Sequence, residues 1–180
     1  MIHDNSSQHE PVSEESSIRV GACHWDYEHW QKSFYPHDLP EDWRLSYYAN
    51  EFSTVLLPAS VMCCNEQTLE SWADDVGEAF RFYALQEAGT AVNERALSLP
   101  ENFAHCFAGF VDLNSGEAAD ILIDENSAVA VINVGSKDLR GWREWLEQSA
   151  SGLRAIFLKD KSLSYQQLKD FKSLLELLNL

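Results

Sequence analysis

The sequence predicts an α/β fold, in the form of a reduced or incomplete TIM-barrel-like parallel sheet of about six strands with surrounding helices. Short apolar runs alternate along the chain with amphipathic segments of helical period, which is typical of strand–helix–strand units. Most of these runs are apolar without interruption, as in strands buried on both faces of a parallel sheet. At 180 residues the chain is shorter than the roughly 250 residues of a complete eight-stranded barrel.

Six segments have the composition of buried strands. They are residues 18–22, 54–59, 81–85, 120–123, 128–134 and 154–159. Runs such as AVAVINV and AIFL are short and apolar, which favours strands over helices of ordinary length. In a parallel sheet the carboxyl ends of the strands share one edge, and ligands bind at that edge.

Five segments between the strands have the period and the end signals of helices. They are residues 41–52, 66–78, 100–113, 138–150 and 164–178. Asn65 can cap the second helix, and Ser164 with Gln167 fits a capping box at the last one. The third begins at Pro100 and carries phenylalanines along one face, so we expect it to continue as a helix to residue 113.

The composition of residues 1–17 predicts a disordered acidic tail ahead of a single domain at 18–180. This segment is rich in Ser, Glu and Asp, and it lacks both an apolar stretch and any Lys or Arg. These features do not fit a secretory signal, and no apolar run approaches the roughly 18 residues that cross a bilayer. We therefore expect a cytoplasmic protein.

The net charge is −16, and the acidic residues are concentrated in the middle of the chain. Between residues 66 and 125, 13 acids stand against two arginines. A surface of this sign repels phosphate backbones and anionic lipids, so we expect neither nucleic acid nor membrane as a partner. It is typical of a soluble protein, or it forms a docking face for a basic protein partner; it indicates no oligomeric state.

Five aromatic rings follow the first predicted strand within eleven residues. They are Trp25, Tyr27, Trp30, Phe34 and Tyr35. Such rings either line a binding site or pack over the ends of the strands. Packing is the simpler interpretation for Trp30, Phe34 and Tyr35, whereas Trp25, which comes directly after the strand, and Tyr27 are candidates for ligand contact.

The motifs of the first third resemble those of the YecE-like family, domain of unknown function seventy-two. The matching residues are Ile18-Arg19-Val20-Gly21, Trp25, Trp30, Phe34-Tyr35-Pro36, Tyr47-Tyr48-Ala49 and Phe52-Ser53-Thr54-Val55. Their order and spacing fit the family over residues 18–55, and the resemblance is faint beyond residue 90. It implies a TIM-barrel-like fold in a short, divergent member, and it implies no settled activity.

The family's polar strand-end residues are mostly replaced by apolar ones. Where the family has a Glu and an Asn at the end of the second strand, this chain has Leu56 and Pro58; where it has a Lys after the third, this chain has Leu85. The family's Arg of a late strand corresponds to Ile132, and its pair of Asn on the final strand corresponds to Leu158-Lys159. The family's Thr-Ser-Gly before Trp25 is replaced by Ala22-Cys23-His24. Loss of one positioned acid, base or electrostatic stabiliser typically slows a reaction by about 10²- to 10⁴-fold. The resemblance and these departures predict a pseudoenzyme whose site has closed into ordinary core.

A few residues could still carry chemistry. Cys23, His24 and Cys63 are of the types that bind zinc, but their spacing is only compatible with a metal site, and buried thiols with a packed histidine explain them as well. His29 is a further ligand-binding candidate. Asp124 follows the strand at 120–123, where barrel enzymes place catalytic acids, although a solvated turn explains it equally. No cofactor is predicted.

Two functions follow from these observations. The first is a non-catalytic binding or scaffolding role, which predicts an apolar surface rimmed by acids where missing barrel strands leave an open sheet edge. The alternative is a metal-dependent hydrolase that acts on a small sugar or a phosphate-bearing substrate.

Overall fold

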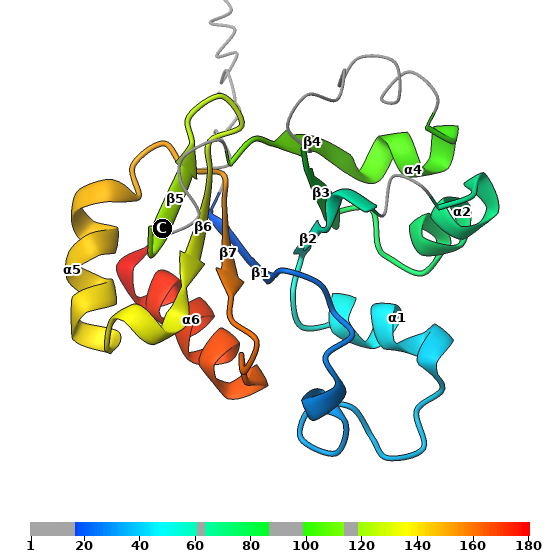
Figure 1. Ribbon diagram of the computed structural model, residues 1–180, viewed down its shortest axis with the longest axis horizontal. Coiled ribbons are helices and arrows are strands. Elements are labelled where there is room, and N and C mark those ends of the chain that lie inside the picture. Colours follow the sequence, from blue (N-terminus) through cyan, green and yellow to red (C-terminus); the bar gives the residue numbers. More distant parts are fainter. Residues whose placement is uncertain (1–16, 61–63, 87–98, 114–118) are drawn as a thin grey trace, which may run out of the picture.

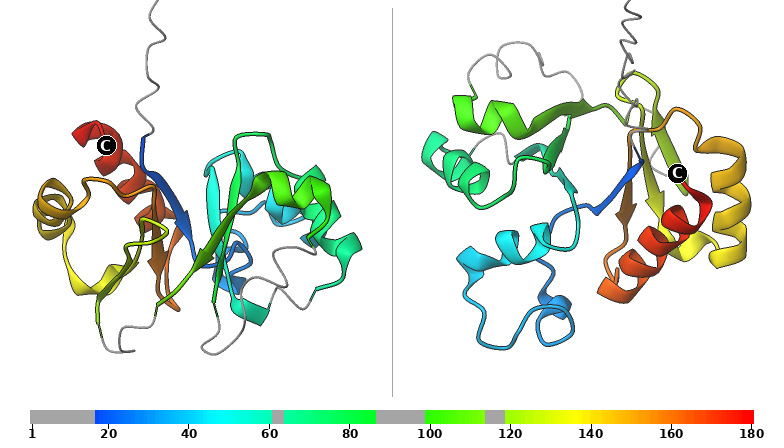
Figure 2. Two further views of the ribbon diagram at one scale, coloured as in Figure 1. Left: turned by 90° about the horizontal axis from the view of Figure 1, so that it is seen from above. Right: turned by 180° about the vertical axis from the view of Figure 1, so that it is seen from behind.

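The computed structural model describes residues 17–60, 64–86, 99–113 and 119–180. The predicted tail, apart from Ser17, and Cys63 lie outside these residues. Within them the chain forms an α/β fold with two sheets, each covered by helices on the face that looks away from the other sheet (Figures 1 and 2).

The first sheet has four strands in the order β1-β7-β6-β5. Their bounds are β1 Arg19–Ala22, β5 Ile121–Asp124, β6 Val129–Asn133 and β7 Ala155–Lys159. The strands β1, β7 and β6 are parallel, and β5 runs antiparallel to β6. Helices α5 (Leu139–Ser149) and α6 (Tyr165–Leu178) cover its outer face, and the short helix η4 (Val134–Ser136) follows β6 (Figure 1).

The second sheet has three parallel strands in the order β2-β3-β4. Their bounds are β2 Thr54–Leu57, β3 Arg81–Leu85 and β4 Phe107–Val111. Its helices are α1 (Arg44–Ala49), α2 (Glu66–Asp74) and α4 (Glu101–Cys106), and two short helices, η1 (Glu28–Trp30) and η2 (Glu41–Trp43), lie between β1 and α1.

The predicted helix caps at Asn65 and Ser164 are confirmed. The Asn65 side chain accepts a hydrogen bond from the backbone N–H of Thr68, and Ser164 forms the expected capping box with Gln167. These side chains satisfy backbone N–H groups that have no partner within the helix. Helices α2 and α6 therefore begin where the sequence predicts.

The predicted helix over 100–113 is wrong beyond Cys106. The chain leaves α4 there and continues as β4, which pairs with β3. Gly109 has a φ of +138°, a conformation that no helix contains, and it lies beside an irregularity in the register of the two strands. Phe103 and Phe107 pack against each other with ring centroids 5.9 Å apart, so the apolar spacing that suggested a helix serves a helix–strand junction instead.

The expectation of a wholly parallel sheet is also wrong, because β5 is antiparallel. Only residues 125–128 separate β5 from β6, which is too short for the crossover that parallel strands require. The reversal places the end of β5 where β6 begins: Asp124 is in register with Val129, the first residue of β6.

Side chains link the two sheets at both pairs of outer strands, and no ladder joins the sheets within the described residues. Between β1 and β2, the Tyr48 hydroxyl accepts from the N–H of Ala22 and donates to the carbonyl of Thr54. Between β4 and β5, the carboxylate of Asp124 accepts from the N–H of Asp112. The sheets are therefore neighbours on both sides, although they do not close into one hydrogen-bonded barrel.

The faces of the two sheets that look toward each other, here called the inner faces, pack together through one set of apolar side chains. This inner cluster consists of Leu56, Tyr83, Val111, Val129, Val131, Ala155 and Phe157. The rings of Tyr83 and Phe157, one from each sheet, lie 5.4 Å apart edge to face. A second, larger cluster lies between the sheets and the helices. The space between the sheets is thus a packed core at the level of these residues.

Candidate functional site

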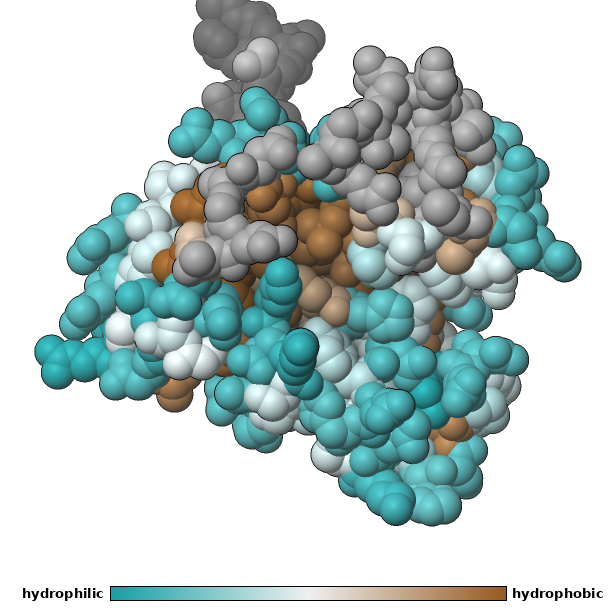
Figure 3. Space-filling model, viewed as in Figure 1, coloured by the Kyte–Doolittle hydropathy of each residue, from teal (hydrophilic) through white to brown (hydrophobic). Residues whose placement is uncertain are grey.

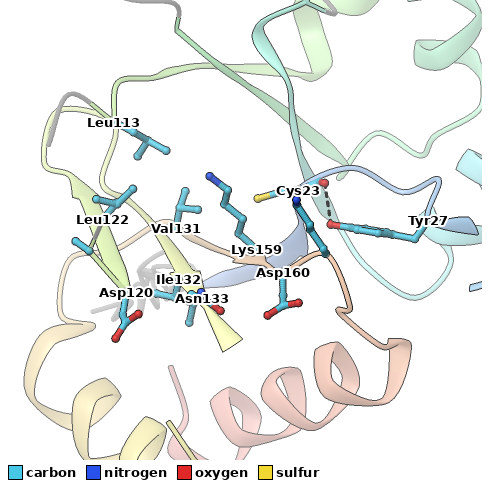
Figure 4. Close-up of a pocket in the computed structure, with 12 residues that line it drawn as sticks. Cys23, Tyr27, Leu113, Asp120, Leu122, Val131, Ile132, Asn133, Lys159 and Asp160 are labelled. Atoms are coloured by element: carbon cyan, nitrogen blue, oxygen red, sulfur yellow. Dashed lines mark hydrogen bonds between the residues drawn. The ribbon is translucent and has the colours of Figure 1, made fainter. Parts of the chain in front are cut away.

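A pocket of about 790 Å³ opens at the carboxyl ends of the parallel strands of the first sheet. It adjoins the inner cluster, with which it shares Val131, and lies beside the ends of β1, β6 and β7 and the start of β5 (Figure 4). Its volume is in the range of sites that hold small molecules. We call it the strand-end pocket.

The lining of the strand-end pocket combines apolar walls with a few polar groups. The apolar residues are Leu113, Ala119, Leu122, Val131 and Ile132. The polar residues are Cys23, Tyr27, Asp120, Asn133, Lys159, Asp160 and Lys161. In the view of Figure 1, hydrophobic residues gather at the surface over the space between the two sheets (Figure 3).

Strand alternation explains why Lys159 reaches the pocket. On β7 the inner face carries Ala155 and Phe157, so the next residue of that face is Lys159, at the last position of the strand. Lys159 is in register with Asn133 at the end of β6. Two polar side chains therefore lie side by side where the parallel strands stop.

The Lys159 ammonium has no ion pair or hydrogen bond with any part of the chain that the structure describes. Figure 4 shows it in the middle of the pocket, between Val131 and Cys23. The carboxylates of Asp120 and Asp160 point away from it in the same view. Lys159 thus presents to the pocket a positive charge that none of the described residues pairs with.

The thiol of Cys23 and the phenol of Tyr27, which also line the pocket, are neutral. Burial raises the pKa of the Cys23 thiol to about 12, and the nearby positive charge of Lys159 lowers it only in part. Burial also raises the pKa of Tyr27, whose hydroxyl donates to the carbonyl of Cys23 at 2.9 Å. A thiol that stays protonated is a poor nucleophile at neutral pH.

Asp160 and Asn133 are engaged in the turns that follow their strands. Asp160 accepts hydrogen bonds from the N–H and the hydroxyl of Ser162, and these bonds lower its pKa. The Asn133 side-chain oxygen accepts from the N–H of Gly135. Both side chains shape the rim of the pocket.

The aromatic segment is mostly core, as the packing interpretation expected for Trp30, Phe34 and Tyr35. The indole N–H of Trp30 donates to the carbonyl of Leu163, and the Tyr35 hydroxyl donates to the carbonyl of Trp25. Trp25 is only 7% exposed and packs edge to face on Trp72, with centroids 5.0 Å apart. Of the five rings, Tyr27 lines the strand-end pocket and the other four do not.

The two candidate histidines contact the backbone and do not line the pocket. His24 stacks on Trp25 at 4.8 Å, and its Nδ1 accepts from the N–H of Asp26 at 2.9 Å. His29 bonds through Nε2 to the carbonyl of Leu163 at 2.7 Å. The zinc prediction also named Cys63, which lies outside the described residues, and the described ranges contain no group of three His, Cys, Asp or Glu placed to hold a metal.

Asp124 lies away from the pocket because of the reversed direction of β5. It is buried, and its carboxylate accepts from the N–H groups of Asp112, Asn126 and Ser127 and from the Ser127 hydroxyl. Burial raises its pKa, but these hydrogen bonds outweigh burial and lower it overall. The residue ties a turn and the two sheets together, and Asp120, at the other end of β5, lines the pocket instead.

Two of the positions at which the family's polar residues are replaced belong to the packing between the sheets. Leu56 is 1% exposed within the inner cluster, and Leu85 packs against it. Ile132 and Leu158 are fully buried in the larger cluster. The polar pocket residues Lys159, Asn133 and Asp120 were missed from the sequence, although the last residue of a parallel strand is a signal that could have found the first two.

A family model described as "Protein of unknown function DUF72" matches residues 19–121. The chain belongs to the DUF72 family. The match ends at the first residue of β5, so the part of the pocket that β6 and β7 supply lies outside the part of this DUF72 chain that the model covers.

No curated protein and no solved structure matches the chain significantly. Among the described residues of this DUF72 protein, no helix is both long enough and apolar enough to cross a membrane.

Proposed function

We propose that this DUF72 protein is a non-catalytic binding protein: a reduced barrel whose interior has become core and whose strand-end pocket takes a small organic ligand. The observation that carries the proposal is the inner cluster. At Leu56, where the family resemblance expects a carboxylate, the side chain packs between the sheets at 1% exposure. A charged group could not be buried there without a partner.

The arrangement of the strands supports the reduced-barrel part of the proposal. Going around the molecule, the strands follow the order β5-β6-β7-β1 and then β2-β3-β4. Tyr48 joins β1 to β2, and Asp124 joins β5 to the end of β4. Side chains therefore link the two sheets at the two places where a full barrel would have ladders, as expected if the fold derives from a barrel.

The pocket itself supports binding and does not favour chemistry. Its thiol and its phenol stay protonated at neutral pH, since burial raises both pKa values. Lys159, in contrast, supplies a charge that a ligand could satisfy. The sequence-based alternatives, a protein scaffold and a metal-dependent hydrolase, have no comparable observation in their favour.

A ligand screen with matched variants tests the proposal. Methyl NMR of the Val, Leu and Ile side chains would report binding of compounds from a fragment library, and mass spectrometry would report whether any bound compound is consumed. Leu122→Trp fills the pocket, whereas Ile123→Trp places the same ring on the other face of β5, where the side chain is 41% exposed.

We expect compounds that shift the methyl groups of Val131 and Leu122 in the wild type and in Ile123→Trp, but not in Leu122→Trp, and that are recovered unchanged. Turnover of a bound compound would overturn the non-catalytic role. Absence of any compound sensitive to Leu122→Trp would overturn the binding role.

A further inference from the structure

We propose that the ligand of the strand-end pocket is an organic monocarboxylate with an apolar body, whose carboxylate pairs with Lys159. The inference rests on the proposed binding function and specifies the chemistry that the site recognises. It uses Lys159, which lies beyond the region that the family model matches.

The charge of the ligand follows from the environment of Lys159. Its ammonium lacks a partner within the described ranges, and the exposed Lys159 side chain lies in the pocket between Val131 and the neutral thiol of Cys23. A carboxylate placed there would form a charge-assisted hydrogen bond in partly apolar surroundings. An ammonium ligand would instead meet a like charge at close range.

The magnitude of the charge follows from the rest of the lining. The lining has two lysines, Lys159 and Lys161, and two aspartates, Asp120 and Asp160, so its formal charges sum to zero. A phosphate monoester is dianionic near neutral pH and usually needs several converging donors. A lining with two ammoniums and two carboxylates suits a monoanion better than a dianion.

The body of the ligand follows from the walls. Leu113 and Leu122 lie on the side of the pocket opposite Cys23, and Val131 forms its floor (Figure 4). Burial of apolar ligand surface on these side chains would provide most of the binding free energy. Lys159 would then set the orientation and the selectivity.

The test is an NMR titration with four compounds that share one chain: octanoate, octan-1-ol, octylamine and octyl phosphate. The proteins are the wild type, Lys159→Met, Lys159→Arg and the control Lys169→Met, which removes an exposed ammonium on α6. Thermal unfolding of each variant verifies that it is folded. If Lys159→Met fails to fold, Lys159→Arg, which keeps the charge, remains as the variant at this position.

We expect octanoate to bind the wild type most tightly, and its affinity to fall about tenfold or more in Lys159→Met, as the loss of a hydrogen bond to a charged group predicts. The octanoate affinities of Lys159→Arg and Lys169→Met should stay within about threefold of the wild-type affinity. Octan-1-ol should bind both the wild type and Lys159→Met with similar affinity.

Equal binding of octanoate and octan-1-ol, an unchanged octanoate affinity in Lys159→Met, or tighter binding of octylamine or octyl phosphate would each overturn the carboxylate inference and leave the binding function standing. Absence of binding by all four compounds would also overturn it. The binding function falls only if the library screen finds no ligand that Leu122→Trp excludes.

Discussion

The hydroxyl of Tyr48 donates a hydrogen bond of 3.0 Å to the carbonyl oxygen of Thr54 at the start of β2. The same hydroxyl accepts a bond of 2.9 Å from the N–H of Ala22 at the end of β1. It is fully buried, and burial raises its pKa well above the ordinary value, so it stays protonated and able to donate. One side chain thus takes the place of a ladder between the two sheets.

Tyr48→Phe should lower the free energy of unfolding by about 1–3 kcal/mol, because it leaves a buried N–H and a buried carbonyl without a partner. Urea denaturation measures this change. Tyr47→Phe is the matched control, since it makes the same chemical change on the same helix and its hydroxyl has no hydrogen bond within the described ranges. Equal effects of the two substitutions would contradict the role of Tyr48.

Gly21→Ala should push β1 away from β2, because Gly21 lies directly against the backbone of Thr54. A Cβ atom at Gly21 would lie 2.2 Å from the carbonyl oxygen of Thr54, which is backbone and cannot rotate away. We expect a loss of roughly 1–3 kcal/mol or more of unfolding free energy, as for other overpacked sites. Gly77→Ala, where a Cβ meets nothing within 4 Å, should change stability by less than about 1 kcal/mol. A tolerated Gly21→Ala would show that the sheets can move apart freely.

His24 holds a backbone conformation that favours glycine, with a φ of +95°. The family resemblance places a Gly at this position. His24→Ala and His24→Gly both remove the ring that stacks on Trp25, but only the second relieves the backbone. We therefore expect the Gly variant to be more stable than the Ala variant by about 1–2 kcal/mol in urea denaturation. Equal stabilities would mean that the backbone at His24 carries no strain.

The pH dependence of stability should include a contribution from His24. Burial lowers its pKa, and the nearby Asp26 opposes this only in part. Because the folded pKa lies below the ordinary value of 6.5, the unfolded chain takes up the proton more readily. Stability that is complete above pH 6.5 is then lost as the pH falls below it. His24→Gln should reduce the drop in unfolding free energy between pH 7.5 and 5.5; an unchanged drop would contradict the assignment.

Much of the fold could be predicted from the sequence, because apolar runs and helix caps are local signals. The caps at Asn65 and Ser164 act within one turn of a helix, and they were found. The strand β4 was missed because Phe103 and Phe107 fit a helical face and a helix–strand junction equally well. Only pairing with β3, which is distant in sequence, decides between the two.

The site was harder to predict, since it depends on strand direction and on the inner or outer face of each strand. Asp124 was the candidate on β5, but the hairpin with β6 turns that end away and brings Asp120 to the pocket. The four-residue connection between β5 and β6 was the available signal for a hairpin. The family resemblance treats Lys159 only as part of a replaced Asn pair and gives no indication that its charge faces a pocket.

The proposed function requires the space between the two sheets to be closed apolar core that holds no active site. The most direct test is Leu56→Glu, which restores the carboxylate that the family resemblance expects, compared with Leu56→Met in urea denaturation at pH 7. We expect the Glu variant to lose about 3 kcal/mol or more relative to the Met variant, or not to fold, because the inner cluster offers no partner for a buried charge. A Glu variant as stable as the Met variant would show that a polar interior survives, and it would contradict the proposed non-catalytic core.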